Sequence, residues 1–197
     1  EGLPFLEAIR QFALERPRED VLFMHITLLP YLSASGELKT KPTQQSVGKL
    51  REIGIQPDVL ICRTEKPMTQ EMAGKISLFC NVRENRVIEE QDVPDTIYQL
   101  PVMLRDANLD NLILEHFQLE ETRSADLTQW EAMIEDVKTA KREVTIAVVG
   151  KYIELHDAYK SIYESLEHAA IANHGKIKLM KVSAESLLDG GVEQLAE

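Results

Sequence analysis

The stretch from Gly36 to Gln44 combines the residue types that proteins use to hold phosphate groups. It reads Gly-Glu-Leu-Lys-Thr-Lys-Pro-Thr-Gln and places two lysines, two threonines and a glutamine in one short segment. Ammonium groups and hydroxyls both donate hydrogen bonds to phosphate oxygens. A helix that starts at Pro42 or Thr43 would add unpaired N–H groups and about half a positive charge. The stretch therefore indicates a polyphosphate site, with a solvated surface turn as the alternative.

The chain around this stretch is acidic. It has 33 Asp and Glu residues against 22 Lys and Arg, a net charge of −11 and a pI near 5.0. Proteins that bind nucleic acids normally carry a broad basic face, so we expect no nucleic-acid partner. No apolar run reaches the roughly 18 residues that span a bilayer, so we expect no membrane association. Local cations would instead serve small anions.

The cysteine content and the chain ends suggest the setting of the protein. Cys62 and Cys80 both lie in apolar surroundings, which predicts buried free thiols and a reducing, cytoplasmic location. The chain begins at Glu1 without a methionine and ends at Glu197 within an α/β pattern. We therefore expect it to be a piece of a longer protein.

Apolar periodicity predicts alternating strands and helices as far as residue 118. Strands are expected at 21–29, 59–62 and 87–90, the first of them covered on both faces, and helices at 4–15, 43–53, 70–79, 96–106 and 109–117. This alternation predicts an α/β fold with a doubly wound, mostly parallel sheet. Arg63 follows the second strand, where ligand crevices form, although a surface arginine fits equally well. His25, within the first strand, is expected to be a core residue rather than a ligand.

The pattern changes at Leu119, which suggests a second domain. We divide the chain into residues 1–118, a linker 119–142 with a helix around Trp130, and residues 143–197. The last part restarts with a strand at 144–149, a helix from Asp157 and a strand at 177–182. Val149-Gly150-Lys151 is an incomplete P-loop pattern, and no spacing predicts a catalytic residue or a set of metal ligands.

Longer strings in the chain resemble the CTP synthase family. They comprise residues 36–44, the following Ser46-Val47, and Ile-Gly-Ile-Gln-Pro-Asp at 53–58. The resemblance continues at residues 1–10, 61–63, 78–82 and 149–155, and so covers nearly the whole chain.

The resemblance implies a fold and a reaction. Residues 1–118 would be the C-terminal part of a P-loop amidoligase domain, and residues 143–197 the start of a class I glutamine amidotransferase domain. With ATP and Mg²⁺, such enzymes phosphorylate O4 of UTP, and ammonia from glutamine then displaces the phosphate to give CTP. GTP acts as activator, and the family forms homotetramers. The P-loop, the magnesium ligands and the amidotransferase triad would all lie outside this chain, which we expect to be inactive alone.

The resemblance also implies roles for individual residues. The triphosphate of UTP or CTP would be bound by one segment, which comprises Lys39, Thr40, Lys41, Pro42, Thr43 and Gln44. Lys75, from the helix expected at 70–79, would add a further contact. Adenine of ATP would be recognised by Arg63, Gln91, Asp92 and Val93. Glu1 matches the end of a segment that reads the ring of inhibitory CTP. Lys160 would help to couple GTP activation to ammonia delivery.

Two departures and two alternatives accompany this reading. Gln45 stands where bacterial members often have His, and His156 where many have Pro. A helix around Trp130 could assemble tetramers into filaments, although packing between domains is the favoured role for Trp130. A stand-alone ATP-dependent amidoligase related to dethiobiotin synthetase is the other alternative, and the restart at Val144 argues against it.

Overall fold

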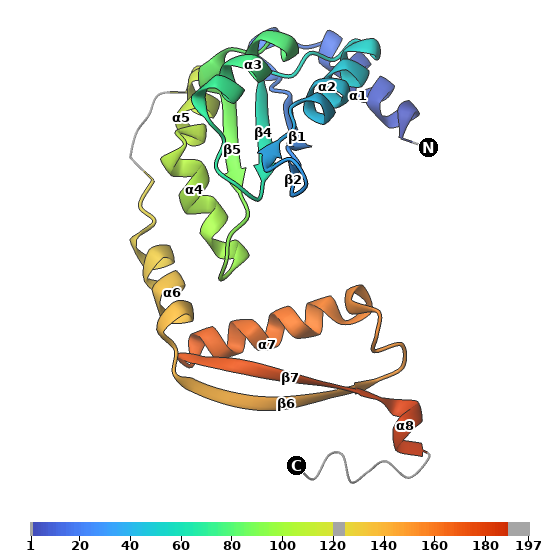
Figure 1. Ribbon diagram of the computed structural model, residues 1–197, viewed down its shortest axis with the longest axis vertical. Helices are drawn as coiled ribbons and strands as arrows, with labels where there is room; N and C mark the ends of the chain where they lie inside the picture. Colours follow the sequence, from blue (N-terminus) through green and yellow to red (C-terminus); the bar gives the residue numbers. More distant parts are fainter. Residues whose placement is uncertain (1, 120–124, 189–197) are drawn as a thin grey trace. The chain divides into compact units, whose positions relative to one another are not determined.

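The protein comprises two compact units, residues 1–125 and 126–197. The computed structural model describes residues 2–119 and 125–188 (Figure 1). The predicted linker at 119–142 lies partly outside these residues, and its helix α6 belongs to the second unit. Among the helices of the described part, none has the length and apolar composition to cross a membrane.

A parallel sheet forms the centre of the first unit. Its strands follow the order β1 (Met24–Leu28), β4 (Val59–Thr64) and β5 (Val87–Gln91). Leu28 pairs with Arg63, and Arg63 pairs with Glu90. The carboxyl ends of the three strands therefore lie side by side at one edge of the sheet.

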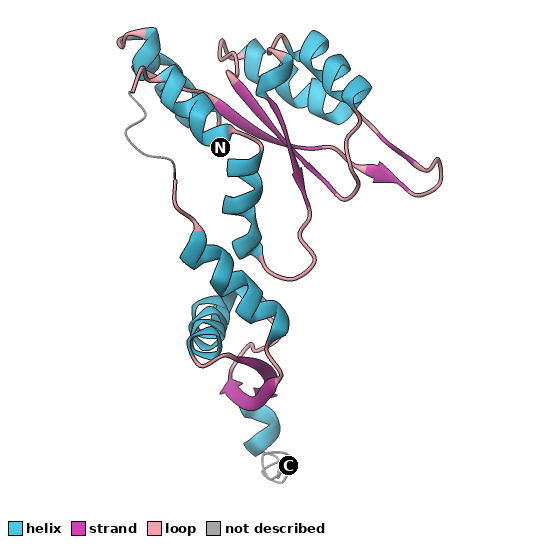
Figure 2. Cartoon of the chain, turned by 90° about the vertical axis from the view of Figure 1, so that its left-hand side faces the viewer, coloured by secondary structure: helices cyan, strands magenta, loops and turns pink. Residues whose placement is uncertain are grey.

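Helices cover both faces of this sheet (Figures 1 and 2), which confirms the predicted doubly wound α/β fold. One face packs on α2 (Lys41–Glu52) and α3 (Gln70–Cys80), the other on α5 (Leu109–His116) and the neighbouring α4 (Leu100–Asp106). Successive side chains of β4 alternate between the faces. Leu60 and Cys62 join one core cluster, and Val59 and Ile61 join the other.

The prediction for the first strand was wrong in one respect. The apolar run at 21–29 was expected to be covered on both faces, but Met24, Ile26 and Leu28 are 47%, 65% and 59% exposed. Within the described residues β1 is an edge strand that pairs with β4 alone. A continuous apolar run indicates that both faces of a strand are apolar, but it does not identify the residues that pack against each face.

Six further elements complete the described part of the first unit. They are α1 (Leu3–Leu14), η1 (Arg18–Asp20), β2 (Tyr31–Leu32), β3 (Glu37–Leu38), η2 (Glu84–Arg86) and η3 (Ile97–Gln99). The antiparallel hairpin of β2 and β3 was not predicted from the sequence. Its turn needs Gly36, whose φ of +67° is a conformation that glycine adopts without steric cost.

The second unit contains the β–α–β arrangement expected from residue 144 onwards. Strands β6 (Arg142–Gly150) and β7 (Gly175–Ser183) are parallel and are connected through η4 (His156–Tyr159) and α7 (Lys160–Ala172). Helices α6 (Thr128–Thr139) and α8 (Ala184–Leu188) flank them along the chain. A Cβ on Gly150 would collide with the ring and hydroxyl of Tyr159, so a larger residue at this position would have to displace that side chain.

Candidate functional site

The predicted phosphate segment is a strand followed by a helix start. Glu37 and Leu38 form β3, and the Lys39 N–H then donates to the carbonyl of Pro30 (2.9 Å). Leu38 is buried in the core cluster under α2 and α3. The hairpin therefore fixes the backbone on both sides of Lys39, while the ammonium group stays partly exposed.

Helix α2 begins at Lys41, one residue before the earliest predicted start, and Thr40 is its N-cap residue. The Thr40 side chain accepts a hydrogen bond from Gln44 Nε2 (3.1 Å) and does not cap a backbone N–H. Thr43, expected at the helix boundary, is fully buried and donates to the carbonyl of Leu28 (3.1 Å). Thr43 thus ties the start of α2 to the end of β1.

Three lysines line one surface cavity of about 630 Å³. Lys39 and Lys41 come from the predicted segment, and Lys75 comes from α3. The remaining lining residues are Pro30, Leu32, Glu37, Leu38, Thr40 and Pro42. By position, the first turn of α2 adds its partial positive charge to this cavity. The arrangement suits a ligand with several negative charges.

Glu37 is a functional candidate that the sequence reasoning did not single out. Its carboxylate forms an ion pair with the Lys39 ammonium group at the cavity. The hydrogen bond from Lys39, followed by the charges of Lys39 and Lys75, lowers the pKa of Glu37 below its ordinary value. Only the spacing of the two residues could have suggested the pair, because side chains two apart in extended chain project to the same side, and β3 itself is too short to show a period.

The predicted adenine residues lie at the same edge of the sheet. Arg63 Nε donates to Asp92 Oδ1 (3.0 Å), and the Asp92 N–H donates to the carbonyl of Thr64 (2.8 Å). The hydrogen bond that Arg63 donates to the Asp92 carboxylate raises the pKa of Arg63. Gln91 is the last residue of β5, and Val93 follows, partly buried. The Leu29 N–H donates to the carbonyl of Arg63 (2.8 Å), which links this loop to the strand end that holds Thr43.

The other predicted residues lie elsewhere. Glu1 falls outside the described residues, and Lys160 is an exposed residue at the start of α7 in the second unit. Gln45 is exposed on α2. His156 lies in η4 with its Nδ1 3.4 Å from Lys181 Nζ.

Two other kinds of reactive side chain lie outside this cavity, the buried cysteines and the half-buried His25, which was expected to be a core residue. Burial raises the pKa of the Cys62 thiol to about 12, so it is not a nucleophile at neutral pH, and both cysteines are buried free thiols as predicted. His25 contacts Ser46 Oγ (2.8 Å), and desolvation lowers the pKa of its imidazole. In the described part of the chain, no three His, Cys, Asp or Glu side chains gather as metal ligands would.

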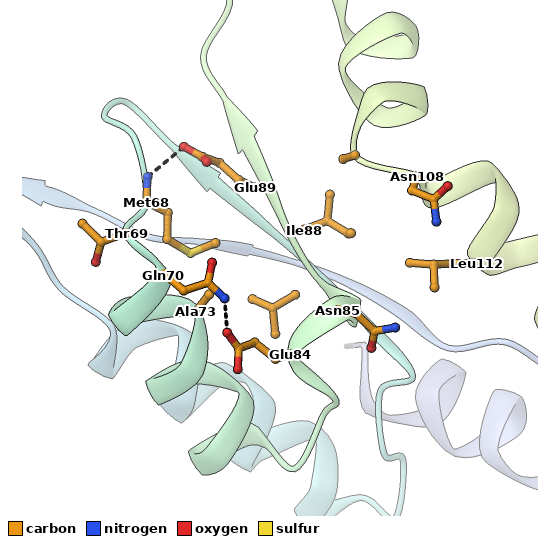
Figure 3. Close-up of a pocket in the computed structure, with 12 residues that line it drawn as sticks. Met68, Thr69, Gln70, Ala73, Glu84, Asn85, Ile88, Glu89, Asn108 and Leu112 are labelled. Carbon is orange, nitrogen blue, oxygen red and sulfur yellow. Dashed lines mark hydrogen bonds between the residues drawn. The ribbon is translucent and has the colours of Figure 1, made fainter.

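A second cavity, of about 620 Å³, lies between α3, β5 and α5 (Figure 3). None of the predicted residues lines it. Its two carboxylates already have partners, since Glu89 accepts from the Met68 N–H (2.8 Å) and Glu84 accepts from the Gln70 amide. The lysine-lined cavity is therefore the stronger candidate for a functional site.

Comparison with known proteins agrees with the resemblance. The family model described as "CTP synthase N-terminus" matches residues 1–119. The CTP synthase of Methylorubrum extorquens is 55% identical over 185 residues, which are 94% of this chain and 34% of that protein. The CTP synthases of Paracoccus denitrificans and Bacillus pumilus are 51% and 48% identical over 99% and 100% of this chain, and over 36% of their own lengths. The chain thus spans about a third of the length of these relatives. Since the family model covers more than half of the chain, the protein belongs to the CTP synthase family.

Proposed function

We propose that this chain is the nucleotide-recognition part of an enzyme that aminates UTP to CTP with ATP and ammonia from glutamine. In this proposal the lysine-lined cavity holds the triphosphate of UTP, and inhibitory CTP uses the same cations. The observation that carries it is the convergence of Lys39, Lys41 and Lys75 on one cavity at the edge of the sheet. Three ammonium groups and a helix start match a triphosphate in charge.

The uncharged residues of the segment would position the cations. Thr43 anchors α2 to β1, and the Thr40–Gln44 hydrogen bond tightens the first turn. Pro42 occupies that turn, where its missing N–H costs nothing. In this proposal the lysines bind the phosphates and the threonines position the lysines, which explains why the threonine hydroxyls already have partners within the protein.

ATP would bind through its adenine base at the Arg63–Asp92 loop. The ion pair with Asp92 can hold the guanidinium plane against an aromatic base, an arrangement that arginine favours. Gln91 and Val93 would supply polar and apolar contacts beside it. Mg²⁺ prefers carboxylate and phosphate oxygens, and in this proposal it accompanies ATP, with its protein ligands outside this chain as the resemblance implies.

The second unit would begin the glutamine amidotransferase domain, with Lys160 coupling GTP activation to ammonia delivery. The CTP synthase relatives align over 94–100% of this chain and so include this unit, which favours the proposal over a stand-alone amidoligase. A homotetramer and a cytoplasmic location belong to the same proposal. The described structure contains no observation that favours filament assembly as the main role.

The test removes both cations of the segment. We expect Lys39→Ala with Lys41→Ala, made in the full-length protein, to weaken UTP and CTP binding together by at least about 100-fold, since each charge-assisted hydrogen bond contributes about 1.5–3 kcal/mol. Isothermal titration calorimetry with each nucleotide measures this. The matched control is Lys49→Ala, which removes an exposed lysine on α2 outside the cavity. Unchanged affinity for UTP and CTP in the double variant would reject the proposal.

A further inference from the structure

Glu37 is an acidic residue in a cavity that otherwise suits an anion. Its carboxylate pairs with Lys39, and both side chains line the cavity together with Lys41 and Lys75. The position is not incidental to the fold, because Glu37 lies on β3, whose pairing with β2 fixes where its side chain projects. A triphosphate entering this cavity would meet a negative charge already paired with one of the cations that it needs, Lys39.

The charges in the cavity explain why such a carboxylate is useful. Without an anion, ammonium groups gathered around one cavity repel one another, and a neighbouring carboxylate reduces that repulsion. The Glu37–Lys39 pair is solvent-exposed, with side chains 53% and 37% exposed. Exposed ion pairs are weak, so a ligand with several negative charges can replace this one at little cost.

We propose that Glu37 is an internal counter-ion of the triphosphate site, which holds Lys39 while the site is empty and releases it to the phosphates when a nucleotide binds. The inference rests on the proposed function, because it takes the cavity to be the UTP site. Glu37 thereby sets the affinity of the site. It holds Lys39 and offsets part of the positive charge of the cavity, and it makes the nucleotide compete for Lys39.

A second ion pair in the same unit provides the comparison. Lys49 and Glu52 on α2 pair at 2.7 Å, with side chains 77% and 65% exposed, and neither lines the lysine cavity. Removing the charge of Glu52 changes the net charge of the protein as much as removing that of Glu37. Any difference in nucleotide affinity between the two variants is therefore due to the position of Glu37 in the cavity and not to the change in net charge.

The test is Glu37→Gln in the full-length protein, titrated calorimetrically with UTP, UDP and UMP. We expect UTP to bind roughly two- to fivefold more tightly, the range set by the strength of exposed ion pairs. The gain falls from UTP to UDP to UMP, because repulsion by Glu37 and the need to displace it grow with the number of phosphates. Glu52→Gln leaves all three affinities unchanged.

A double variant tests whether Glu37 acts on UTP binding through its ion pair with Lys39. In a Lys39→Ala background, Glu37→Gln gives a smaller gain for UTP, because the pair to be broken is already absent. An equal or weaker UTP affinity in Glu37→Gln, or a gain of the same size for all three nucleotides, would overturn the inference. If Lys39→Ala with Lys41→Ala leaves UTP binding unchanged, the proposed function fails. If Lys39→Ala weakens UTP while Glu37→Gln does not strengthen it, only the counter-ion role fails.

Discussion

The lysine cavity and the Arg63–Asp92 loop lie at the same edge of one sheet, yet they are built differently. At the cavity, Thr40 and the neighbouring Thr43 are buried and hydrogen-bonded within the protein, whereas Lys41 and Lys75 are exposed and Lys39 pairs with Glu37. In the loop, the guanidinium of Arg63 donates to Asp92. The first region gathers three cations around one cavity, and the second fixes the orientation of a single flat cation.

This difference follows from the chemistry of the two side chains. Lysine is a compact charge on a flexible stem and can adapt to phosphate oxygens from several directions. Arginine is planar, and an ion pair at its edge leaves its face open to an aromatic ring. This difference fits the proposed function, in which the first region recognises phosphates and the second recognises a base, and the two roles can be tested separately.

The largest effect is expected from reversing the charge that α3 contributes. Lys75→Glu removes one cation from the cavity and adds a negative charge that repels the triphosphate. We expect UTP and CTP affinity to fall about 100-fold or more while ATP affinity stays unchanged. Equilibrium binding of the three nucleotides measures this, with Lys49→Glu on α2 as the control for charge. A parallel loss of ATP affinity would mean that the two regions are one site.

The next effect concerns the anchor of the cavity. Thr43→Val keeps the shape of the side chain but leaves the Leu28 carbonyl without its donor. Burying an unpaired carbonyl costs about 1–3 kcal/mol, so the urea midpoint should fall accordingly. Thr40→Val is the matched variant, and its loss should be smaller because the Gln44 amide can turn towards water. Equal losses of stability in the two variants would contradict the prediction that Thr43 stabilises the fold more than Thr40 does.

A smaller effect is expected at the adenine loop. Arg63→Ala should weaken ATP binding about tenfold without changing UTP binding, since a stacked cation contributes on the order of 1 kcal/mol or somewhat more. Arg63→Lys should behave like Arg63→Ala, because lysine keeps the charge and loses the plane. Full recovery by lysine would show that charge rather than stacking matters there.

The smallest effect is a pH dependence from His25, in the strand whose end carries the Thr43 anchor. Desolvation lowers the pKa of folded His25 below the ordinary value of about 6.5, so the folded state resists protonation. This histidine therefore costs stability as the pH falls below about 6.5, down to its folded pKa, and has no effect at higher pH. Thermal unfolding between pH 7.5 and 5.5 should show a shallower decline in His25→Gln. An unchanged slope would contradict this.

Much of the fold could be predicted because apolar periodicity is a local property. The strands at 59–62 and 87–90 and the helices at 43–53 and 70–79 all have counterparts in β4, β5, α2 and α3. The β2–β3 hairpin escaped prediction because each strand is two residues long, too short for any period to register. The exposure of Ile26 escaped it because burial depends on distant neighbours rather than on the strand itself.

By itself the sequence determined that cations and hydroxyls gather between Gly36 and Gln44, because those residues are neighbours in the chain. Only the tertiary structure decided how they are used. The crossover from β1 through α2 and β4 to α3 brings Lys75 to the cavity that Glu37 and Lys39 line. Burial turned Thr43 from a possible ligand contact into an anchor, because its hydroxyl faces the end of β1.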